Sequence, residues 1–264
     1  LADGTGVSHP PGRAGDRLVV CRRHQNQTVG RLRGARRRPH TAWTVEDAET
    51  AKKIAELFGR VPAFYIADGH HRSAAAVRVF EKRKDKPGPH ECFLSVIFPH
   101  DQMQILPYNR VVKDLNGIEP AQFLEKLRQV GIVESGGQSK PEKKHEICVY
   151  LAGQWHRFHW GKKLVAPQDT LGKLDVSLLQ LNVLARVLGI EDPRRDPRIK
   201  FVGGIRGTAE LEKLVNSGQF AVAFSMYPTN LLDLMAVADE GQVMPPKSTW
   251  FEPKLRDGLF CHLL

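Results

Sequence analysis

The sequence predicts an α+β protein with a mixed sheet, and three observations lead to this class. Short apolar runs typical of strands are interspersed with segments in which apolar residues recur every three or four positions, as in helices. No internal repeat is visible, which argues against a solenoid. The composition, 41% hydrophobic and 26% charged over 264 residues, indicates a globular chain with a sizeable core.

The first elements are set by local signals. Residues 44–47, Thr-Val-Glu-Asp, resemble a capping box with Asp in place of Glu and open a predicted helix that Gly59 ends. An apolar run at 63–67 follows a proline and predicts a strand. A second helix is expected to begin just after Gly69 and to continue through strong helix formers to a basic last turn at 82–84.

The remainder of the chain continues this mixture of elements. Residues 152–153, Ala-Gly, join two strand-like runs into a predicted hairpin. The predicted strands are 92–98, 103–107, 147–151, 154–160, 199–202 and 219–226. The predicted helices are 120–130, 176–188, 208–216 and 230–238.

The first 38 residues differ from the rest in composition. They hold nine arginines against Asp3 and Asp16, so +7 of the net charge of +10 lies here, and the other 226 residues are nearly balanced. Such a segment could be a basic arm for nucleic acid or an anionic surface. The favoured interpretation is a disordered or aberrant segment, because it has no sustained period. We expect this leader at 1–38, a portion with a polar cluster at 39–115, and a C-terminal portion at 116–264.

Two absences narrow the class of protein. No run approaches the roughly 18 apolar residues of a membrane span, and the N-terminus has no apolar secretory segment. The cysteines at 21, 92, 148 and 261 are widely spaced, which argues against a zinc site and a disulfide framework. We therefore expect a cytoplasmic protein that does not associate with a membrane.

The polar cluster at 68–73, Asp-Gly-His-His-Arg-Ser, predicts an anion-binding loop. A helix that begins after Gly69 directs free backbone N–H groups and a partial positive charge at the loop. The glycine lets a ligand approach closely, Arg72 offers a two-pronged donor for phosphate, and Ser73 adds a hydroxyl.

The acidic and basic groups of the same loop suggest chemistry. His70 and His71 can donate to phosphate or exchange protons near neutral pH. Asp68 could orient a histidine, hold a metal bridging the phosphates, or take a proton from an acceptor hydroxyl. The structural alternative is that Asp68 caps the helix while His71 packs beneath it. Anion binding is favoured, because such sites concentrate at strand-to-helix junctions.

A second cluster follows two prolines near the C-terminus. Lys247, Ser248 and Thr249 could complete a phosphate or substrate pocket, with an aromatic residue of 250–251 packing on a base or ring. Equally, the prolines could make a rigid turn into final strands, with the aromatic residues filling the core.

Other candidate residues carry weaker signals. Arg110 could reach an anion, and a surface salt bridge is at least as plausible. The glycines of 203–207 resemble a phosphate loop but lack the G-x-x-x-x-G-K pattern. His156 and His159 fall on opposite faces of a strand, which argues against a shared metal.

Four stretches together resemble a large, poorly characterised bacterial family of unknown function. They read YIADGHHR at 65–72, LPYNR at 106–110, FVGG at 201–204 and MPPKSTWFEPK at 244–254. The resemblance covers about residues 40–264 and is specific because the stretches occur in order.

The DGHHR loop is also similar to that of the ParB/sulfiredoxin-like superfamily, whose members hold nucleotide phosphates with a G-x-x-R turn. The nearest functional analogy within it is to free-serine kinases, which phosphorylate L-serine from a nucleotide. This resemblance implies ATP or ADP with Mg²⁺ as cofactors, a phosphate cradle at residues 69–72, and Asp68 assisting transfer to a small-molecule hydroxyl.

Full members of the bacterial family carry an additional N-terminal part with acidic residues, which residues 1–38 do not resemble. We therefore expect a truncated or frame-shifted copy whose phosphate loop survives without full activity, because a catalytic carboxylate in that N-terminal part would be missing. The alternative function is a non-enzymatic, ParB-like protein that senses nucleotides or associates with nucleic acid through its basic leader. The near-neutral charge of 39–264 argues against this alternative.

Overall fold

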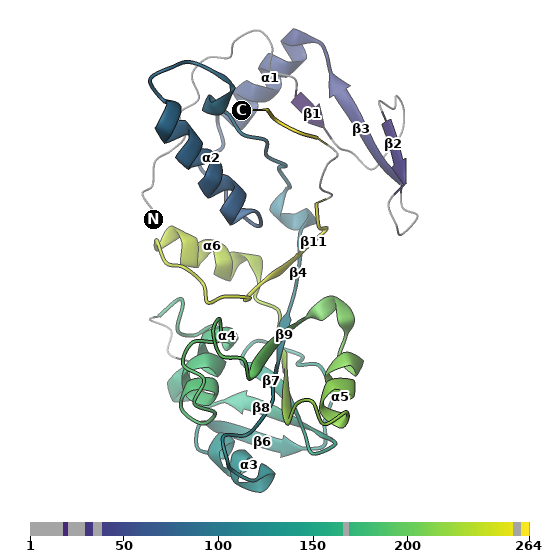
Figure 1. Cartoon of the computed structure of the whole chain (residues 1–264), viewed down its shortest axis with the longest axis vertical. Coiled ribbons are helices and arrows are strands. Elements are labelled where there is room, and N and C mark those ends of the chain that lie inside the picture. The colour runs from purple at the N-terminus through teal and green to yellow at the C-terminus, as the bar shows by residue number, and fades with distance from the viewer. Residues whose placement is uncertain (1–17, 21–29, 34–38, 166–168, 256–259, 264) are drawn as a thin grey trace. The chain divides into compact units, whose positions relative to one another are not determined.

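A computed structural model describes residues 18–20, 30–33, 39–165, 169–255 and 260–263, with side chains from residue 43 onward (Figure 1). The chain divides into two compact units, Leu1–Tyr65 and Ile66–Leu264, which are described separately. The domain boundaries expected after residues 38 and 115 stay a prediction.

The N-terminal unit contains a three-stranded antiparallel sheet in the order β1-β3-β2. Its strands are β1 (Leu18–Val20), β2 (Gly30–Arg33) and β3 (Pro39–Val45). Two of them lie within the leader for which we expected disorder, and the rest of residues 1–38 lies outside the described residues.

Helix α1 (Ala48–Phe58) completes this unit. Asp47 is its N-cap, and the Asp47 Oδ2 atom accepts a hydrogen bond from the Thr50 amide at 2.7 Å. The cap thus lies three residues after the predicted Thr44, because Thr44 still belongs to β3. The helix ends at Gly59, as predicted.

The C-terminal unit is built around a six-stranded sheet in the order β6-β8-β7-β10-β5-β9. The strands are β5 (Tyr108–Val112), β6 (Gly131–Ser135), β7 (Glu146–Leu151), β8 (Gln154–Trp160), β9 (Ile199–Gly203) and β10 (Val222–Met226). Each described pair of neighbouring strands is antiparallel, so the sheet is antiparallel rather than the mixed sheet predicted. Strand direction depends on which strands become neighbours, and only β7 and β8 are both neighbours and consecutive in the chain. The predicted α+β class is confirmed.

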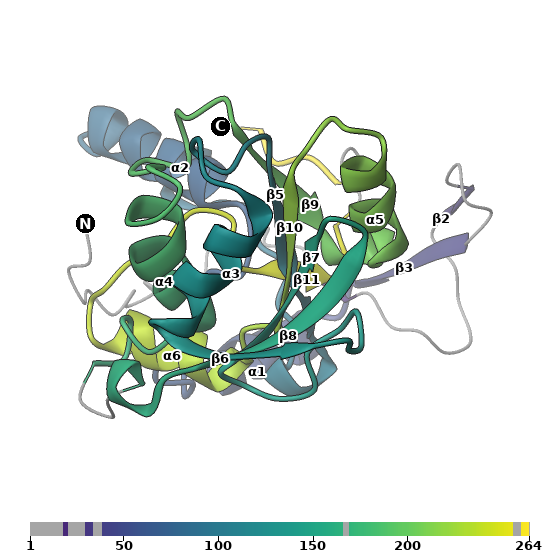
Figure 2. The same ribbon diagram turned by 90° about the horizontal axis from the view of Figure 1, so that it is seen from below.

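Helices cover both faces of this sheet, and Figure 2 shows α5 on the side opposite α3, α4 and α6. Their bounds are α3 (Pro120–Arg128), α4 (Asp175–Leu179), which continues as a π-helix (Gln180–Ala185), α5 (Ala209–Asn216) and α6 (Leu231–Asp239). The larger core includes Phe123, Ile147 and Phe224, and the smaller core under α5 includes Leu211 and Val111. The central strands β5, β7 and β10 are therefore buried on both faces, whereas the edge strand β6 is partly exposed.

The predicted hairpin is confirmed as β7 and β8, joined at Ala152-Gly153 with Leu151 opposite Gln154. Within β8, His156 is buried and His159 is half-buried on the other face, as strand alternation requires. The two histidines therefore share no metal.

The rest of this unit consists of one helix, one small sheet and short 3₁₀ turns. Helix α2 (His70–Arg83) begins directly after Gly69, and strands β4 (Gln104–Leu106) and β11 (Trp250–Glu252) form an antiparallel pair. The 3₁₀ turns are Pro89–Glu91, His100–Gln102, Lys162–Leu164 and Gly204–Arg206.

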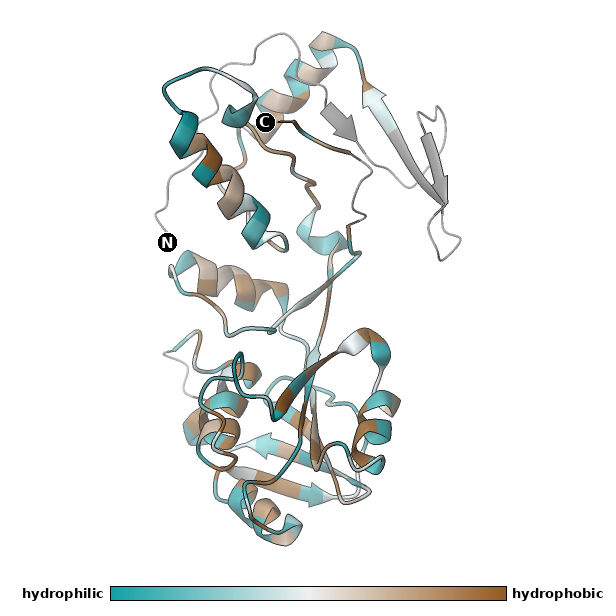
Figure 3. Ribbon diagram, viewed as in Figure 1, coloured by the Kyte–Doolittle hydropathy of each residue, from teal (hydrophilic) through white to brown (hydrophobic). Residues whose placement is uncertain are grey.

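Two predicted strands, 63–67 and 92–98, are wrong: both segments are irregular. The side chains of Phe64 and Phe93 remain 56% and 54% exposed, and the hydrophobic character of the second segment is visible in Figure 3. The physical reason is that a strand needs a neighbouring strand for its backbone hydrogen bonds, and among the described residues neither segment has one.

Two strands of this unit, β5 and β6, were not predicted. In β5 the polar residues Asn109 and Arg110 are buried, so a prediction based on hydrophobicity misses the strand.

Within the described part of the chain, no helix has the length and apolar character needed to cross a bilayer. None of the described cysteines, Cys92, Cys148 and Cys261, forms a disulfide, and Cys21 lies outside the described residues.

Candidate anion-binding site

The N-terminus of α2 has the backbone geometry predicted for an anion-binding loop. Gly69 is the N-cap residue and has a left-handed backbone with φ +88°. A side chain is strained in this region, and a Cβ atom at Gly69 would also lie 3.3 Å from the Arg72 guanidinium. Glycine therefore permits both the turn and the close approach of Arg72.

The polar groups of this turn face solvent. His70, His71 and Arg72 are exposed, and no side chain caps the helix at Gly69. The first intrahelical bond after the cap runs from the Ser73 amide to the Gly69 carbonyl at 3.0 Å. The first-turn amides of a helix have no acceptor inside the helix, so this end can bind an anion. The exposure of His71 contradicts the alternative in which it packs beneath the helix.

Asp68 is held by two hydrogen bonds at the entrance to the loop. Its Oδ1 atom accepts from the Gly69 amide at 2.8 Å, and its Oδ2 atom accepts from Lys254 Nζ at 2.9 Å. The Lys254 hydrogen bond, followed by the Gly69 amide and the charges of Lys254 and Arg72, lowers the pKa of Asp68. The carboxylate is therefore ionised. Among the described hydrogen bonds, Asp68 accepts from the amide of the N-cap residue Gly69 and from no amide of the first helical turn, so it does not cap the helix in the usual way.

Lys254 connects the loop to a pair of aromatic rings. Its ammonium nitrogen lies 5.3 Å from the centroid of the Trp250 ring, which in turn lies 5.3 Å from the Tyr108 ring. The Lys247 ammonium lies 5.6 Å from the Tyr108 centroid. Three of the stretches that carry the family resemblance, 65–72, 106–110 and 244–254, thus meet in one series of contacts.

The fourth stretch, 201–204, is explained by packing around the same rings. Tyr108 is opposite Gly203 in the β5–β9 pair. A Cβ atom at Gly203 would lie 2.3 Å from the Trp250 ring, and one at Gly204 would lie 2.7 Å from the Pro107 carbonyl oxygen. Gly203 thus lets Trp250 approach the sheet and Gly204 makes room for Pro107, so these two glycines of the segment 203–207 have a structural explanation.

Arg110 is buried at the centre of this arrangement, with only 3% of its surface exposed. Its guanidinium donates hydrogen bonds to the Tyr108 carbonyl and, at 3.2 Å, to the Lys247 carbonyl, and it lies 5.5 Å from the Phe201 ring. Burial lowers the pKa of Arg110 to about 10. No carboxylate pairs with it among the described residues, so the alternative of a surface salt bridge is wrong.

The turn at 245–249 combines structural and available groups. The Ser248 hydroxyl is buried and donates to the Pro245 carbonyl at 2.6 Å, which favours the predicted rigid turn over a ligand contact for this residue. Thr249 is half-buried, and Lys247 is exposed with a left-handed backbone at φ +55°. Phe251 fills the core, and β11 is the final strand that the prolines were expected to introduce.

Sequence reasoning missed Lys254 and the pairing of Tyr108 with Trp250. Glu252 supports this arrangement, because it accepts from Trp250 Nε1 at 2.8 Å. All four residues lie in stretches that the family resemblance had already singled out. Their positions in those stretches were the available signal, and their contacts could not be inferred from spacing.

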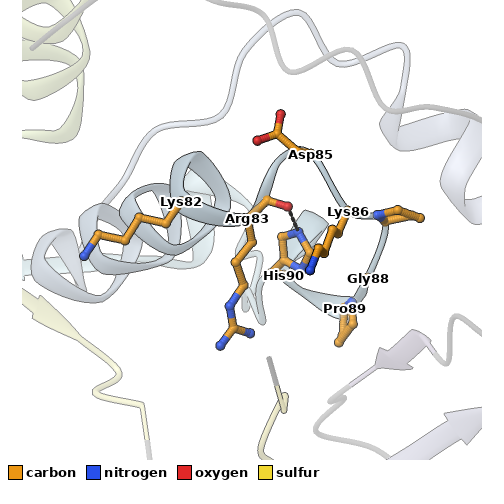
Figure 4. A pocket seen from close by; sticks show the side chains of 8 residues that line it. Lys82, Arg83, Asp85, Lys86, Gly88, Pro89 and His90 are labelled. Carbon is orange, nitrogen blue, oxygen red and sulfur yellow. Dashed lines mark hydrogen bonds between the residues drawn. The ribbon is translucent and has the colours of Figure 1, made fainter.

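A hollow of about 440 Å³ lies at the other end of α2 and is lined by Lys82, Arg83, Asp85 and 86–90. Figure 4 shows the His90 ring against the Arg83 carbonyl, to which its Nε2–H donates at 2.9 Å. Basic residues at a helix C-terminus complement the helix dipole. The basic residues of the lining therefore have a structural explanation, and the hollow is separate from the loop at the N-terminus of α2.

Comparison with known proteins places the chain in a family. Residues 18–177 match the model of the family described as "Protein of unknown function (DUF1015)", and the chain belongs to that family. The match begins inside the segment 1–38 and ends before residue 201, so it differs in extent from the resemblance expected over 40–264. No curated protein matches the chain.

Several solved structures are similar to this one at low identity. A free serine kinase in complex with AMP is 16% identical, with a TM-score of 0.39, over 73% of this chain and 68% of the other. A mutant of that kinase with AMP is 18% identical, with a TM-score of 0.39, over 73% and 69%. A conserved hypothetical protein from Pyrococcus furiosus is 15% identical, with a TM-score of 0.39, over 73% and 71%.

Proposed function

We propose that this family member binds the phosphate groups of a nucleotide at the N-terminus of α2 and supports phosphoryl transfer to a small hydroxyl compound such as serine. The observation that carries the proposal is the left-handed Gly69, which opens an exposed helix N-terminus against the Arg72 guanidinium. Backbone amides and a guanidinium directed at one place are the groups that hold phosphate in proteins.

Each residue of the loop has a defined part in this proposal. Gly69 keeps the backbone open to the phosphates, Arg72 neutralises their charge, and His70 and His71 donate hydrogen bonds from the exposed face. The Ser73 hydroxyl, one residue further along the helix, is a further donor. The likeness to the ParB/sulfiredoxin-like G-x-x-R turn supports the same assignment as an analogy.

Asp68 is suited to orient the acceptor hydroxyl. Because its pKa is lowered, it is ionised and can accept a hydrogen bond from the incoming hydroxyl. Lys254 already occupies its Oδ2 atom, so an acceptor must share or replace that contact. The ion pair therefore holds Asp68 in place before substrate binds.

The Mg²⁺ expected from the resemblance fits only as an ion carried by the nucleotide. The described residues contain no group of three or more carboxylate, histidine or cysteine side chains that could hold a metal. Mg²⁺ is commonly bound by one or two carboxylates together with substrate phosphates, so Asp68 would be its protein ligand. When bound, the ion would neutralise charge on the phosphates.

The alternative function is non-enzymatic nucleotide sensing, or association with nucleic acid through the nine arginines of residues 1–38. That charge is the observation that favours it. It predicts DNA binding that weakens steeply with salt, because each neutralised phosphate releases counterions. The enzymatic proposal predicts nucleotide binding and turnover instead.

The test is calorimetric titration of the full chain with ADP, ATP and duplex DNA. We expect Arg72→Ala to weaken nucleotide binding at least about tenfold, the loss of a charge-assisted contact worth 1.5–3 kcal/mol. Arg78→Ala, which removes an exposed arginine further along α2, is the matched control and should bind like the parent protein.

Equal nucleotide affinity in both variants would contradict the loop assignment. Transfer to serine is then followed as formation of phosphoserine from ATP. Nucleotide binding without any transfer to serine or another small alcohol would favour the sensing alternative.

A further inference from the structure

The contact between Lys254 and Asp68 places a lysine beside the loop at the N-terminus of α2. Lys254 Nζ lies 2.9 Å from Asp68 Oδ2, while Asp68 Oδ1 accepts from the amide of Gly69, the N-cap residue of the helix. Asp68 thus connects the ammonium to the helix N-terminus through two hydrogen bonds. The proposed function gives a part to each residue of the loop, and gives Lys254 none beyond holding Asp68.

Lys254 is anchored at its backbone and exposed at its tip. Its amide donates to Glu252 Oε2 at 3.2 Å, and Glu252 Oε1 accepts from Trp250 Nε1 at 2.8 Å. The Lys254 side chain is 42% exposed, and a lysine carries its ammonium on a flexible four-carbon chain. The ammonium can therefore change its partner while the backbone of Lys254 stays in place.

An ionised Asp68 and a phosphate bound at the loop would compete for this ammonium. The attraction between two ions increases with the charge of each, and the phosphates of a nucleotide carry more charge than one carboxylate. An ion pair as exposed as that of Lys254 with Asp68 contributes little to stability, so little is lost when it opens. The balance of charge therefore favours the movement of Lys254 from the carboxylate to the phosphates.

We propose that Lys254 exchanges Asp68 for the phosphates of a bound nucleotide, so that nucleotide binding opens the Oδ2 atom of Asp68 to the acceptor hydroxyl. This inference rests on the proposed function and adds to it a phosphate ligand and an order of events. Without nucleotide, Lys254 occupies the carboxylate and compensates its charge. With nucleotide, Lys254 joins Arg72 and the amides of the loop in neutralising the phosphates, and Asp68 becomes available.

The test is calorimetric titration of the full chain with ADP at constant ionic strength, using Lys254→Gln, Asp68→Asn and the double variant. Lys254→Gln should raise the dissociation constant for ADP at least fivefold, because a phosphate ligand is lost and the Asp68 charge is left uncompensated. Asp68→Asn should lower the dissociation constant, since Lys254 no longer has to leave a carboxylate. In the Asp68→Asn background, Lys254→Gln should again raise it at least threefold.

The double variant separates exchange from charge compensation alone. If Lys254 stayed on Asp68 and only compensated its charge, Asp68→Asn would make the lysine dispensable. An effect of Lys254→Gln smaller than threefold in that background would therefore overturn the exchange. Lys126→Gln, which removes an exposed lysine from α3, is the matched control and should bind ADP like the parent protein. Equal ADP affinity of the Lys254→Gln and Lys126→Gln variants would also overturn the proposal.

NMR follows the movement of Lys254 itself. The side-chain resonances of Lys254 should shift when ADP is added and stay unchanged with adenosine, which has no phosphate. Resonances that ADP leaves unchanged would overturn the exchange.

Failure of the proposed function gives a different pattern of results. A parent protein that binds no ADP, or an Arg72→Ala variant that binds it with parental affinity, would contradict the nucleotide loop and the exchange with it. ADP binding that is weakened by Arg72→Ala and unaffected by Lys254→Gln would overturn the exchange alone and leave the proposed function in place.

Discussion

The six-stranded sheet and the segment 61–102 both contain short apolar runs, but only the runs of the sheet are buried. Phe123 and Phe224 in the sheet core are fully buried, whereas Phe93 and Ile97 in the segment are about half exposed. The difference lies in partners, because each strand of the sheet has a neighbour and two helical layers cover its faces. Strand-like composition thus produces a strand only where another part of the chain supplies the missing hydrogen bonds and cover.

The largest predicted effect tests this comparison with a matched pair of aromatic residues. Phe123→Ala should lower the free energy of unfolding by about 3–5 kcal/mol, because it leaves a cavity in a closed core. Phe93→Ala should change it by less than about 0.5 kcal/mol, since surface changes rarely matter more. Urea unfolding followed by circular dichroism measures both. A cost for Phe93→Ala comparable with that of Phe123→Ala would show that the segment is buried in solution.

The second prediction contrasts two aspartates, one in each region. Burial of Asp175 in the sheet region raises its pKa to about 7, whereas the pKa of the exposed Asp68 is lowered. A folded pKa above the unfolded value means that the folded protein binds more protons between about pH 4 and pH 7. The protonated Asp175 carboxyl therefore favours the folded state. Its contribution to the free energy of unfolding is fully present below about pH 4 and is lost as the pH rises through about 7.

Asp175→Asn should remove this loss of stability, because asparagine does not ionise. A tenfold change in proton affinity is worth about 1.4 kcal/mol, so the free energy of unfolding of the variant, relative to that of the parent protein, should increase by on the order of 2–4 kcal/mol between pH 4 and pH 8. Unfolding curves of both proteins at each pH measure the difference. A constant difference across this range would contradict the raised pKa.

The third prediction tests how tightly the aromatic pair packs on the sheet. Gly203→Ala places a Cβ atom 2.3 Å from Trp250 and should cost about 1–3 kcal/mol, as overpacking does. Gly137→Ala is the matched control, since its Cβ would meet Arg157 at an ordinary 3.5 Å. Thermal and urea unfolding measure both variants. Equal stability would mean that the Trp250 ring moves away without cost.

The smallest effect concerns the contact between Lys254 and Asp68. Both side chains are more than 40% exposed, so Lys254→Gln should change the free energy of unfolding by no more than about 1 kcal/mol. It should nevertheless raise the pKa of Asp68 toward its ordinary value, because the Lys254 hydrogen bond is the main cause of the lowering. Carboxyl NMR titration detects this change, and an unchanged Asp68 pKa would exclude the ion pair in solution.

Much of the fold could be predicted from the sequence, because helix ends and hairpins depend on neighbouring residues. Gly69 and Asn230 open helices as predicted, and the β7–β8 hairpin lies where the turn residues placed it. The strands at 63–67 and 92–98 were wrong because the same local signals say nothing about partners. The loop at 68–73 keeps its predicted helix N-terminus but follows an irregular segment rather than a strand.

The sequence by itself determined the α+β class, the start of α2 and the residue types of the phosphate loop, since these follow from periodicity and capping over a few residues. Only the tertiary structure decided that Arg110 is buried against Lys247 and that Lys254 holds Asp68. These contacts join residues 137 and 186 positions apart. Such contacts depend on the register between strands and on the space that glycines leave for aromatic rings. Neither can be inferred from a pattern of neighbouring residues.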